Sequence, residues 1–342
     1  GLTGPDGAWL RQAGGRGKAG RGVVVGVIDS GIWPESASFR GRPLSATPRT
    51  RWDITRTGET VRMRKADGTW FEGRCQLGHE VDGAPARAER WSVDQCTTKI
   101  VGARYYPEEF LEEVPEEQRS PVEYLSPRDG NGHGTHTAGT AVGRTVHDVA
   151  VEGVRFGTLS GMAPGAKLAS YKVCFDDVDL ETADCFDGAV ISAIEDAVAD
   201  GVDVINFSIS GSTDTVLDPT ELALEGAAEA GVFVATTAGN AGPGESTVSH
   251  NSPWVTTVAG TMHRTYENTV VLGNGRALRG ASSTRTPLPM TPLVDSLTVP
   301  ARGATREEAE LCLPGSLAPR RVRGRIVVCT RGTNPRVEKS KV

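Results

Sequence analysis

Between residues 167 and 236 the chain alternates between short apolar runs and segments with helical periodicity. The apolar runs occupy residues 167–173, 202–208 and 232–236. Within residues 189–198, apolar side chains recur at i, i+1, i+4, i+5, i+8 and i+9, which forms one apolar stripe along a helix. Strand, helix, strand, helix, strand in close succession predicts a parallel sheet with helices packed on it. We therefore expect the α/β fold class.

Both predicted helices carry residues that suit their ends. Gly201 follows the first apolar stripe and suits a C-terminal cap. Asp218 suits the N-cap of the second helix, Pro219 its first position, and Glu221 completes a capping-box-like pattern. Gly231 ends this helix just before the next apolar run. Residues 40–106, by contrast, show no regular pattern and are expected to be irregular.

A further apolar run, VVVGVI at residues 23–28, is typical of a strand that is covered on both faces. In parallel sheets the reactive site lies at the carboxyl ends of the strands. Asp29, Ser208 and Asn240 all stand at or just after such ends. We therefore expect these three residues to share one edge of the sheet.

Residues 129–140, DGNGHGTHTAGT, place a histidine between glycines at the start of a run of small, helix-compatible residues. Gly132 and Gly134 leave room for substrate and for neighbouring backbone beside the ring of His133. An imidazole titrates near neutral pH, so it accepts a proton from a hydroxyl and returns it to a leaving amine. His133 is therefore the candidate general base.

Three motifs follow one another along the chain: GVIDSG at residues 26–31, the histidine motif, and TTAGNAG at residues 236–242. This order, with IWPE at residues 32–35, resembles the subtilisin-like serine peptidases, or subtilases. The resemblance covers nearly the whole chain and implies a subtilisin-like parallel sheet flanked by helices. It also implies that Asp29 orients the catalytic histidine and that Asn240 donates to an oxyanion.

His136 follows His133 by three residues, and such a pair raises metal binding as an alternative. The chain holds no His-Glu-x-x-His motif and no third ligand at a recognisable spacing. In subtilases the first histidine of this motif is catalytic and the second supports the structure. The resemblance therefore implies no metal at these histidines and no cofactor. Calcium sites are common in bacterial subtilases, yet this sequence offers no distinctive ligand set for one.

Ser208, Ile209, Ser210 and Gly211 follow the central apolar run. In subtilases the matching Ser-Leu-Gly segment pairs with extended substrate and walls the main specificity pocket. Ile209 and Ser210 replace the usual leucine and glycine, and Ser210 adds a side chain beside the expected peptide path. The resemblance predicts protein or peptide substrates that bind along these four residues.

One part of a subtilase is absent from the printed sequence, because none of its 342 residues belongs to a Gly-Thr-Ser-Met-Ala nucleophile motif. Residues 312–317 and 324–329 resemble the start of a protease-associated (PA) domain, a β-rich module that many subtilases carry before the serine. We expect the N-terminal part of a catalytic domain over residues 1–283, and a linker with an incomplete PA-like domain over residues 284–342. The serine is expected beyond Val342, so the chain alone is expected to be inactive.

The sequence leaves two other functions as alternatives. The first is a truncated, non-catalytic protein that acts by binding other proteins through its PA-like module. A stop codon directly after the printed sequence would favour it. The second is a nucleotide-binding α/β enzyme, which is disfavoured because residues 29–31, DSG, follow the first apolar run where a Gly-x-Gly-x-x-Gly turn would hold a pyrophosphate.

The six cysteines fall into three neighbouring pairs and form no Cys-x-x-Cys motif. Many connectivities are open to six cysteines, although local pairing is the simplest. Plant-type subtilases carry cysteines in similar surroundings. Disulfides would indicate an oxidising, extracellular setting, and buried thiols in a cytosolic protein are the alternative. The candidates are Cys75, Cys96, Cys174, Cys185, Cys312 and Cys329.

The formal net charge is −6, and no apolar run approaches the roughly 20 residues that span a membrane. Nothing in this composition calls for a nucleic acid or an anionic membrane as a partner. The chain begins at Gly1 with no recognisable signal peptide, which we interpret as a processed or excised segment. A secreted protein remains the expectation, and the resemblance adds a prodomain of the same protein as a partner.

Overall fold

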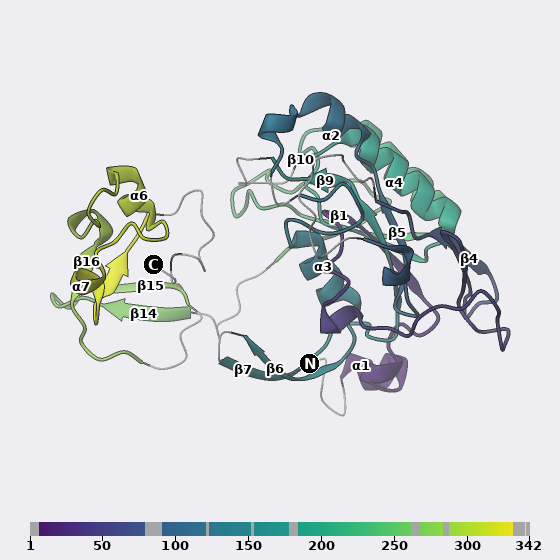
Figure 1. The fold of residues 1–342 in the computed structure, drawn as a ribbon, viewed down its shortest axis with the longest axis horizontal. Helices are drawn as coiled ribbons and strands as arrows, with labels where there is room; N and C mark the ends of the chain where they lie inside the picture. The colour runs from purple at the N-terminus through teal and green to yellow at the C-terminus, as the bar shows by residue number, and fades with distance from the viewer. Residues whose placement is uncertain are drawn as a thin grey trace. The chain divides into compact units, whose positions relative to one another are not determined.

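The computed structural model describes residues 7–78, 91–120, 123–151, 154–177, 184–260, 267–282, 287–330 and 339 (Figure 1). Contacts divide the chain into two compact units, with the boundary between Ala259 and Gly260. Within the described ranges, no helix has both the length and the apolar composition that crossing a membrane requires.

The core of the larger unit is a six-stranded parallel sheet in the order β13-β12-β11-β1-β8-β5. The central strand β1 (Val24–Asp29) pairs with β11 (Val204–Phe207) on one side and with β8 (Lys167–Lys172) on the other. The outer strands are β12 (Phe233–Thr237), β13 (Thr256–Val258) and β5 (Ile100–Tyr105). The predicted α/β class with a parallel sheet is confirmed.

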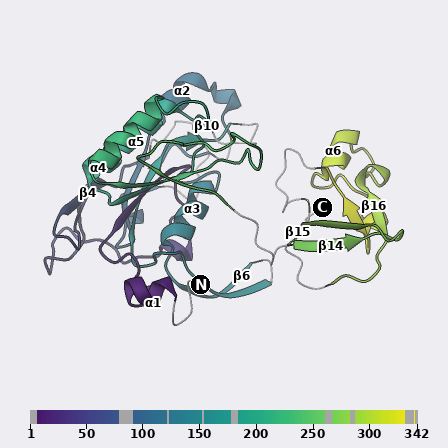
Figure 2. The same ribbon diagram turned by 180° about the vertical axis from the view of Figure 1, so that it is seen from behind.

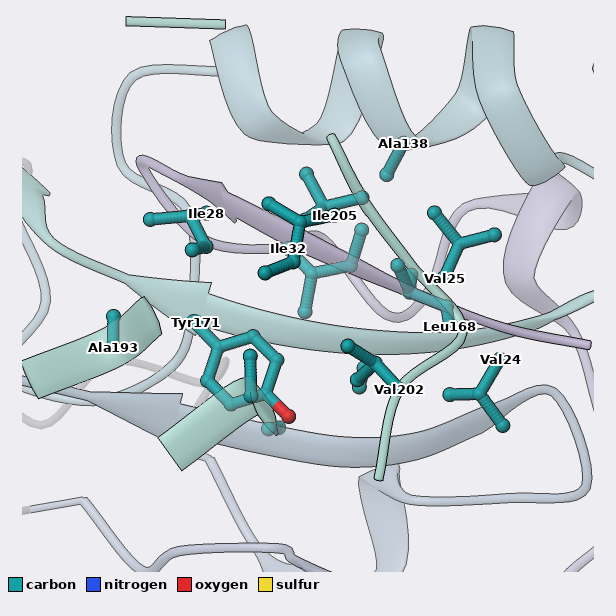
Figure 3. Close-up of a cluster of buried hydrophobic side chains, with 14 of the residues drawn as sticks. Val24, Val25, Ile28, Ile32, Ala138, Leu168, Tyr171, Ala193, Val202 and Ile205 are labelled. Atoms are coloured by element: carbon teal, nitrogen blue, oxygen red, sulfur yellow. The ribbon is translucent and has the colours of Figure 1, made fainter. Parts of the chain in front are cut away.

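Helices cover both faces of this sheet (Figure 2). α3 (His133–Val142) and α4 (Asp187–Asp200) both contact β1 and β8, and α5 (Pro219–Glu229) packs beside α4. Figure 3 shows Ala138 of α3 and Ala193 of α4 on opposite sides of β1. All six residues of β1 are buried, as expected for a strand with a helix layer on each face.

The helix ends follow the sequence signals, with one exception. Gly201 caps α4 with a left-handed φ of 85°. Asp218 caps α5, since its Oδ1 accepts a hydrogen bond from Glu221 N at 2.9 Å. The predicted hydrogen bond from the Glu221 side chain back to the N-cap is wrong, because this side chain binds His250 instead. A tertiary partner therefore replaces the local one.

The prediction that residues 40–106 are irregular is wrong. They contain β5 and a three-stranded antiparallel sheet of β2 (Thr55–Thr57), β3 (Thr60–Arg64) and β4 (Trp70–Arg74). In β3 and β4 only alternate residues are buried, so neither shows the continuous apolar run of a central parallel strand. Strands this short leave too few repeats for the alternation to stand out.

The predicted local pairing of the cysteines is confirmed. Disulfides join Cys75 to Cys96, Cys174 to Cys185, and Cys312 to Cys329. They close short loops, with separations of 21, 11 and 17 residues. Each can stabilise the folded chain by about 2–4 kcal/mol by restricting the unfolded state.

The smaller unit contains an antiparallel pair, β14 with β15, and a parallel pair, β16 with β17. β16 lies within residues 284–342, for which a linker and an incomplete PA-like domain were predicted, and residues 284–286 fall outside the described ranges. The PA-like assignment and the boundary at residue 284 stay predictions. The elements of this unit are β14 (Glu267–Val271), β15 (Ala277–Ala281), β16 (Leu293–Asp295), α6 (Arg306–Leu311), α7 (Pro319–Val322) and β17 (Ile326–Val328).

The remaining elements of the larger unit lie outside the central sheet and its covering helices. Two are short pairs of strands, β6 with β7 and β9 with β10. Their bounds, with those of the two remaining helices, are α1 (Ala8–Ala13), α2 (Glu108–Glu113), β6 (Val146–Val151), β7 (Val154–Leu159), β9 (Cys174–Phe175) and β10 (Asp184–Cys185).

Candidate active site

The carboxyl end of β1 and the start of α3 bring Asp29 and His133 together. Asp29 is the last residue of β1 and is 2 % exposed. His133 is the first residue of α3, after Gly132 adopts a left-handed φ of 99°. Asp29 Oδ1 lies 2.7 Å from His133 Nδ1. The carboxylate also accepts hydrogen bonds from Ser30 N at 2.7 Å and from Thr137 Oγ1 at 3.0 Å, so three groups hold it in place.

The environment of His133 suits a base. A carboxylate only accepts hydrogen bonds, so Nδ1 carries the hydrogen that faces Asp29 and Nε2 of the neutral ring keeps its lone pair. The hydrogen bond to Asp29 raises the pKa of His133 above its ordinary value of 6.5, partial burial opposes this, and the charges of Asp29 and Asp129 add to it. The His133 side chain is 51 % exposed. The ring can therefore receive a proton from outside the protein core, and Asp29 stabilises the imidazolium that results.

Asp129 holds the turn that precedes α3. Its Oδ1 accepts hydrogen bonds from Ser30 Oγ at 3.0 Å, from Asn131 N at 3.1 Å and from Gly132 N at 2.7 Å. Its Oδ2 accepts from Thr135 N at 2.9 Å and from the Thr135 hydroxyl. Sequence reasoning assigned this residue no role. The available signal was an aspartate shortly before a helix start, which typically binds backbone N–H groups in the turn.

Ser30 and Gly134 join the end of β1 directly to the start of α3. Ser30 Oγ accepts a hydrogen bond from Gly134 N at 2.9 Å. A Cβ on Gly134 would lie 2.3 Å from Gly31 O, so only glycine lets α3 approach the end of β1 this closely. A Cβ on Gly132 would meet nothing within 4 Å, so Gly132 is needed for its positive φ and not for space.

The other predicted site residues lie at the ends of the neighbouring strands. β1, β11 and β12 are adjacent and parallel, so Asp29, Ser208 and Asn240 follow strand ends at the same edge of the sheet. Asn240 is exposed beyond the end of β12. A Cβ on Gly239 would lie 3.4 Å from Ser210 Oγ, which places the residue before Asn240 beside the predicted substrate-binding segment.

A cavity of about 310 Å³ opens beside the same segment. Residues 209–212 form part of its lining, and the rest comes from the ends of β10 and β11 and the starts of α4 and α5. The lining includes apolar groups from Val190 and Phe207. A concave, partly apolar space at the carboxyl edge of a parallel sheet is a suitable place for a side chain of a bound peptide.

His136 is exposed on α3, one turn beyond His133. Across the described ranges, no group of three or more His, Cys, Asp or Glu side chains is arranged to hold a metal ion. The supporting role of His136 stays a prediction, and no calcium ligands are assigned.

Comparison with known proteins places this sequence in a family. The model of the subtilase family matches residues 20–315, a range that contains Asp29, His133 and Asn240. The chain belongs to the subtilase family. The predicted family is thereby confirmed, and subtilases are serine endopeptidases, which act on protein substrates.

Two plant subtilases illustrate the similarity. Subtilisin-like protease SBT1.6 of Arabidopsis thaliana is 36% identical over 347 residues, which cover 100% of this chain and 40% of that relative. Subtilisin-like protease SBT1.3 of the same plant is 38% identical over 327 residues, which cover 94% of this chain and 37% of that relative. This subtilase chain therefore spans about two fifths of the length of these relatives.

Proposed function

We propose that this subtilase chain belongs to a serine endopeptidase in which Asp29 orients His133, His133 acts as general base and Asn240 is an oxyanion donor. The observation that carries the proposal is the 2.7 Å contact between Asp29 Oδ1 and His133 Nδ1. This contact leaves Nε2 as the free nitrogen of a half-exposed ring at the carboxyl edge of the sheet. The attacking serine is assigned to a segment that the 342 residues do not contain.

The proposed reaction proceeds in two acyl-transfer steps. His133 Nε2 removes the proton of the serine hydroxyl as the serine oxygen bonds to the carbonyl carbon of the substrate. The carbonyl oxygen takes the electron pair of the broken π bond, and the Asn240 side-chain N–H stabilises its charge. The carbon–nitrogen bond then breaks, and the leaving amine takes the proton from the imidazolium of His133. Water repeats the sequence on the acyl-enzyme and releases the acid.

The substrate is proposed to be an extended peptide. Main-chain groups of the segment from Ser208 to Gly211 would pair with it by strand addition. The cavity of about 310 Å³ beside Ile209 would receive one of its side chains. The exposed side chain of Ser210 lies in the same segment and would narrow the peptide path.

An extracellular setting is part of the proposal. Disulfides persist in oxidising compartments and are rare where glutathione keeps thiols reduced. All six cysteines of this chain are paired, and two of the three disulfides lie in the larger unit. The proposed partners are protein or peptide substrates and a prodomain of the same protein.

Labelling with a fluorophosphonate probe tests the proposed function. The protein encoded by the complete gene should be labelled and should hydrolyse a peptide substrate. The isolated 342-residue chain should do neither, because His133 has no serine hydroxyl to activate. His133→Ala in the complete protein is the matched control and should abolish both signals. Labelling of the isolated chain, or a complete protein that shows neither signal, would contradict the proposal.

A further inference from the structure

A second carboxylate–histidine pair lies behind the predicted substrate-binding segment. His250 Nδ1 lies 2.5 Å from Glu221 Oε1, and His250 Nε2 lies 2.7 Å from the backbone oxygen of Ile209. Glu221 Oε2 accepts a hydrogen bond from the hydroxyl of Ser252. The side chains of His250 and Glu221 are 0% and 2% exposed. This cluster joins α5 to the segment that follows β11.

The partners of His250 determine where its hydrogens lie. A backbone carbonyl cannot donate, so Nε2 must carry a hydrogen and donate it to Ile209 O. One further hydrogen lies between Nδ1 and the Glu221 carboxyl group, whichever of the two carries it. Both ring nitrogens are therefore occupied, and His250 cannot take a proton from a substrate or a nucleophile. The role of His250 must therefore be to hold the groups bonded to its two ring nitrogens in place.

The backbone at His250 supports such a function. His250 has a φ of 56°, in the left-handed region that residues with a Cβ rarely adopt. Conformations of this kind persist where the surrounding structure demands them. The ring also packs against Gly211, where a Cβ would lie 2.6 Å from His250 Cε1. One side chain thus holds the carbonyl of Ile209 and limits position 211 to glycine.

We propose that His250, braced by Glu221, is a positioning residue that fixes the segment from Ser208 to Gly211 for pairing with an extended peptide. This inference rests on the proposed function, since it concerns how the same enzyme holds its substrate. The hydrogen bond to Ile209 O holds this carbonyl against His250, inside the protein. The segment then presents its remaining main-chain groups to a peptide without first having to be ordered. Ordering the segment in advance lowers the entropy lost on binding and keeps the scissile bond near the catalytic pair.

Two substitutions at position 250 test the two hydrogen bonds of His250 one at a time. The amide nitrogen of asparagine takes the place of Nδ1, so His250→Asn keeps a donor to Glu221 and loses the donor to Ile209. Asparagine also tolerates a positive φ, so this change introduces no backbone strain. The amide nitrogen of glutamine takes the place of Nε2, so His250→Gln restores the donor to Ile209. His147→Asn, at an exposed position in β6, is the matched control.

The readout is the dependence of activity on substrate length in the complete protein, with active enzyme counted by fluorophosphonate titration. A peptide with four residues before the scissile bond pairs with the segment by strand addition, whereas an ester of glycine has neither preceding residues to pair with it nor a side chain to enter the cavity. We expect His250→Asn to lower kcat/KM for the long peptide by about tenfold, mainly through KM. For the ester, kcat/KM should change by less than about twofold, since the catalytic pair is unaltered. His250→Gln should recover most of the loss, and His147→Asn should match the unaltered protein.

The outcomes distinguish a failure of the positioning role of His250 from a failure of the proposed function. Equal losses on peptide and ester, or a loss that glutamine does not recover, would overturn the positioning role while leaving the proposed function intact. An unaltered complete protein that neither binds the probe nor cleaves peptide would overturn the proposed function, and the positioning role with it. If His250→Asn does not fold, Glu221→Gln is the second variant, because it weakens the hydrogen bond that holds His250 and leaves the side chain at position 221 the same size. The positioning role then requires Glu221→Gln to show a loss on the long peptide alone.

Discussion

The larger unit contains two carboxylate–histidine pairs that have the same kind of contact but differ in how exposed the histidine is. Asp29 with His133 and Glu221 with His250 each meet through Nδ1, at 2.7 Å and 2.5 Å. Both carboxylate side chains are 2% exposed. The His133 side chain is 51% exposed, whereas that of His250 is fully buried. The second nitrogen distinguishes the pairs, since Nε2 of His250 binds Ile209 O, whereas Nε2 of His133 has no hydrogen-bond partner among the described residues.

This comparison shows that a short contact between a carboxylate and an imidazole does not by itself identify a catalytic pair. A general base needs a lone pair within reach of the proton that it removes. A supporting residue needs every polar atom bonded, because an unpaired polar group in the protein interior is costly. The two pairs should therefore respond differently to substitution.

The largest effect is expected from His133→Ala. Removal of the general base should lower kcat for peptide hydrolysis in the complete protein by a factor on the order of 10⁶. The fold should persist, because the ring is half exposed. Steady-state kinetics with circular dichroism as the folding control would measure this. His136→Gln is the comparison variant and should keep at least about a tenth of the activity. A larger loss of kcat in His136→Gln than in His133→Ala would reverse the assignment of the two histidines.

Substitutions of the two carboxylates should differ in whether they mainly lower kcat or the free energy of unfolding. Asp29→Asn should lower kcat by about 10⁴, because the histidine loses its orienting acceptor and the stabilisation of its imidazolium. Glu221→Gln should lower the free energy of unfolding by about 3 kcal/mol, because it breaks a buried pair, and should leave kcat nearly unchanged while it raises KM for long peptides. Kinetics and denaturant unfolding on both variants test this contrast. A large stability loss in Asp29→Asn alone would remove the distinction between the pairs.

The close approach of α3 to β1 should be visible in a pair of glycine substitutions. Gly134→Ala should destabilise the chain by about 1–3 kcal/mol, because the new Cβ would lie 2.3 Å from Gly31 O. Gly139→Ala lies in the same helix, where the nearest atom would be 3.8 Å away. It should stabilise the chain by about 0.5–1 kcal/mol through helix propensity. Equal effects in thermal unfolding would rule out the close approach as the cause.

The smallest expected effect is a change in the titration of His133. In the folded chain its pKa should lie above 6.5, because of the hydrogen bond to Asp29, and Asp29→Asn should lower it. A raised folded pKa means that the pair adds stability below the unfolded value near 6.5, and that this contribution is lost as pH rises through the folded value. NMR titration of the imidazole in the 342-residue chain measures both. An unchanged pKa in Asp29→Asn would show that the carboxylate does not control this ring.

Much of the central architecture followed from patterns that are local in sequence. The apolar run at residues 23–28 and the stripe at residues 189–198 predicted a buried strand and a helix, and both are present. A site at the carboxyl ends of strands follows from parallel pairing, so Asp29 could be placed at that edge before its partner was known. Residues 100–105 were missed, because a short strand with glycine and arginine in it gives a weak periodic signal.

Part of the site could not be predicted in the same way. Asp129 binds Ser30, which lies 99 residues earlier in the chain, and no local pattern reports such a partner. Glu221 shows the limit most clearly, because its position predicted a bond to its own helix start and its side chain binds His250 instead. A local hydrogen bond to exposed backbone yields to a buried partner that would otherwise stay unpaired.

The sequence by itself predicted the parallel sheet, because parallel strands and amphipathic helices depend on short-range periodicity. The resemblance of the Asp, His and Asn motifs predicted the family, and local pairing of the cysteines was the simplest of several open connectivities. Only the tertiary structure decided which histidine is buried with both ring nitrogens bonded, which glycine is required by contact, and which carboxylate binds His250. Those outcomes depend on burial and on partners distant in sequence, and both arise only when the sheet and its helices pack together.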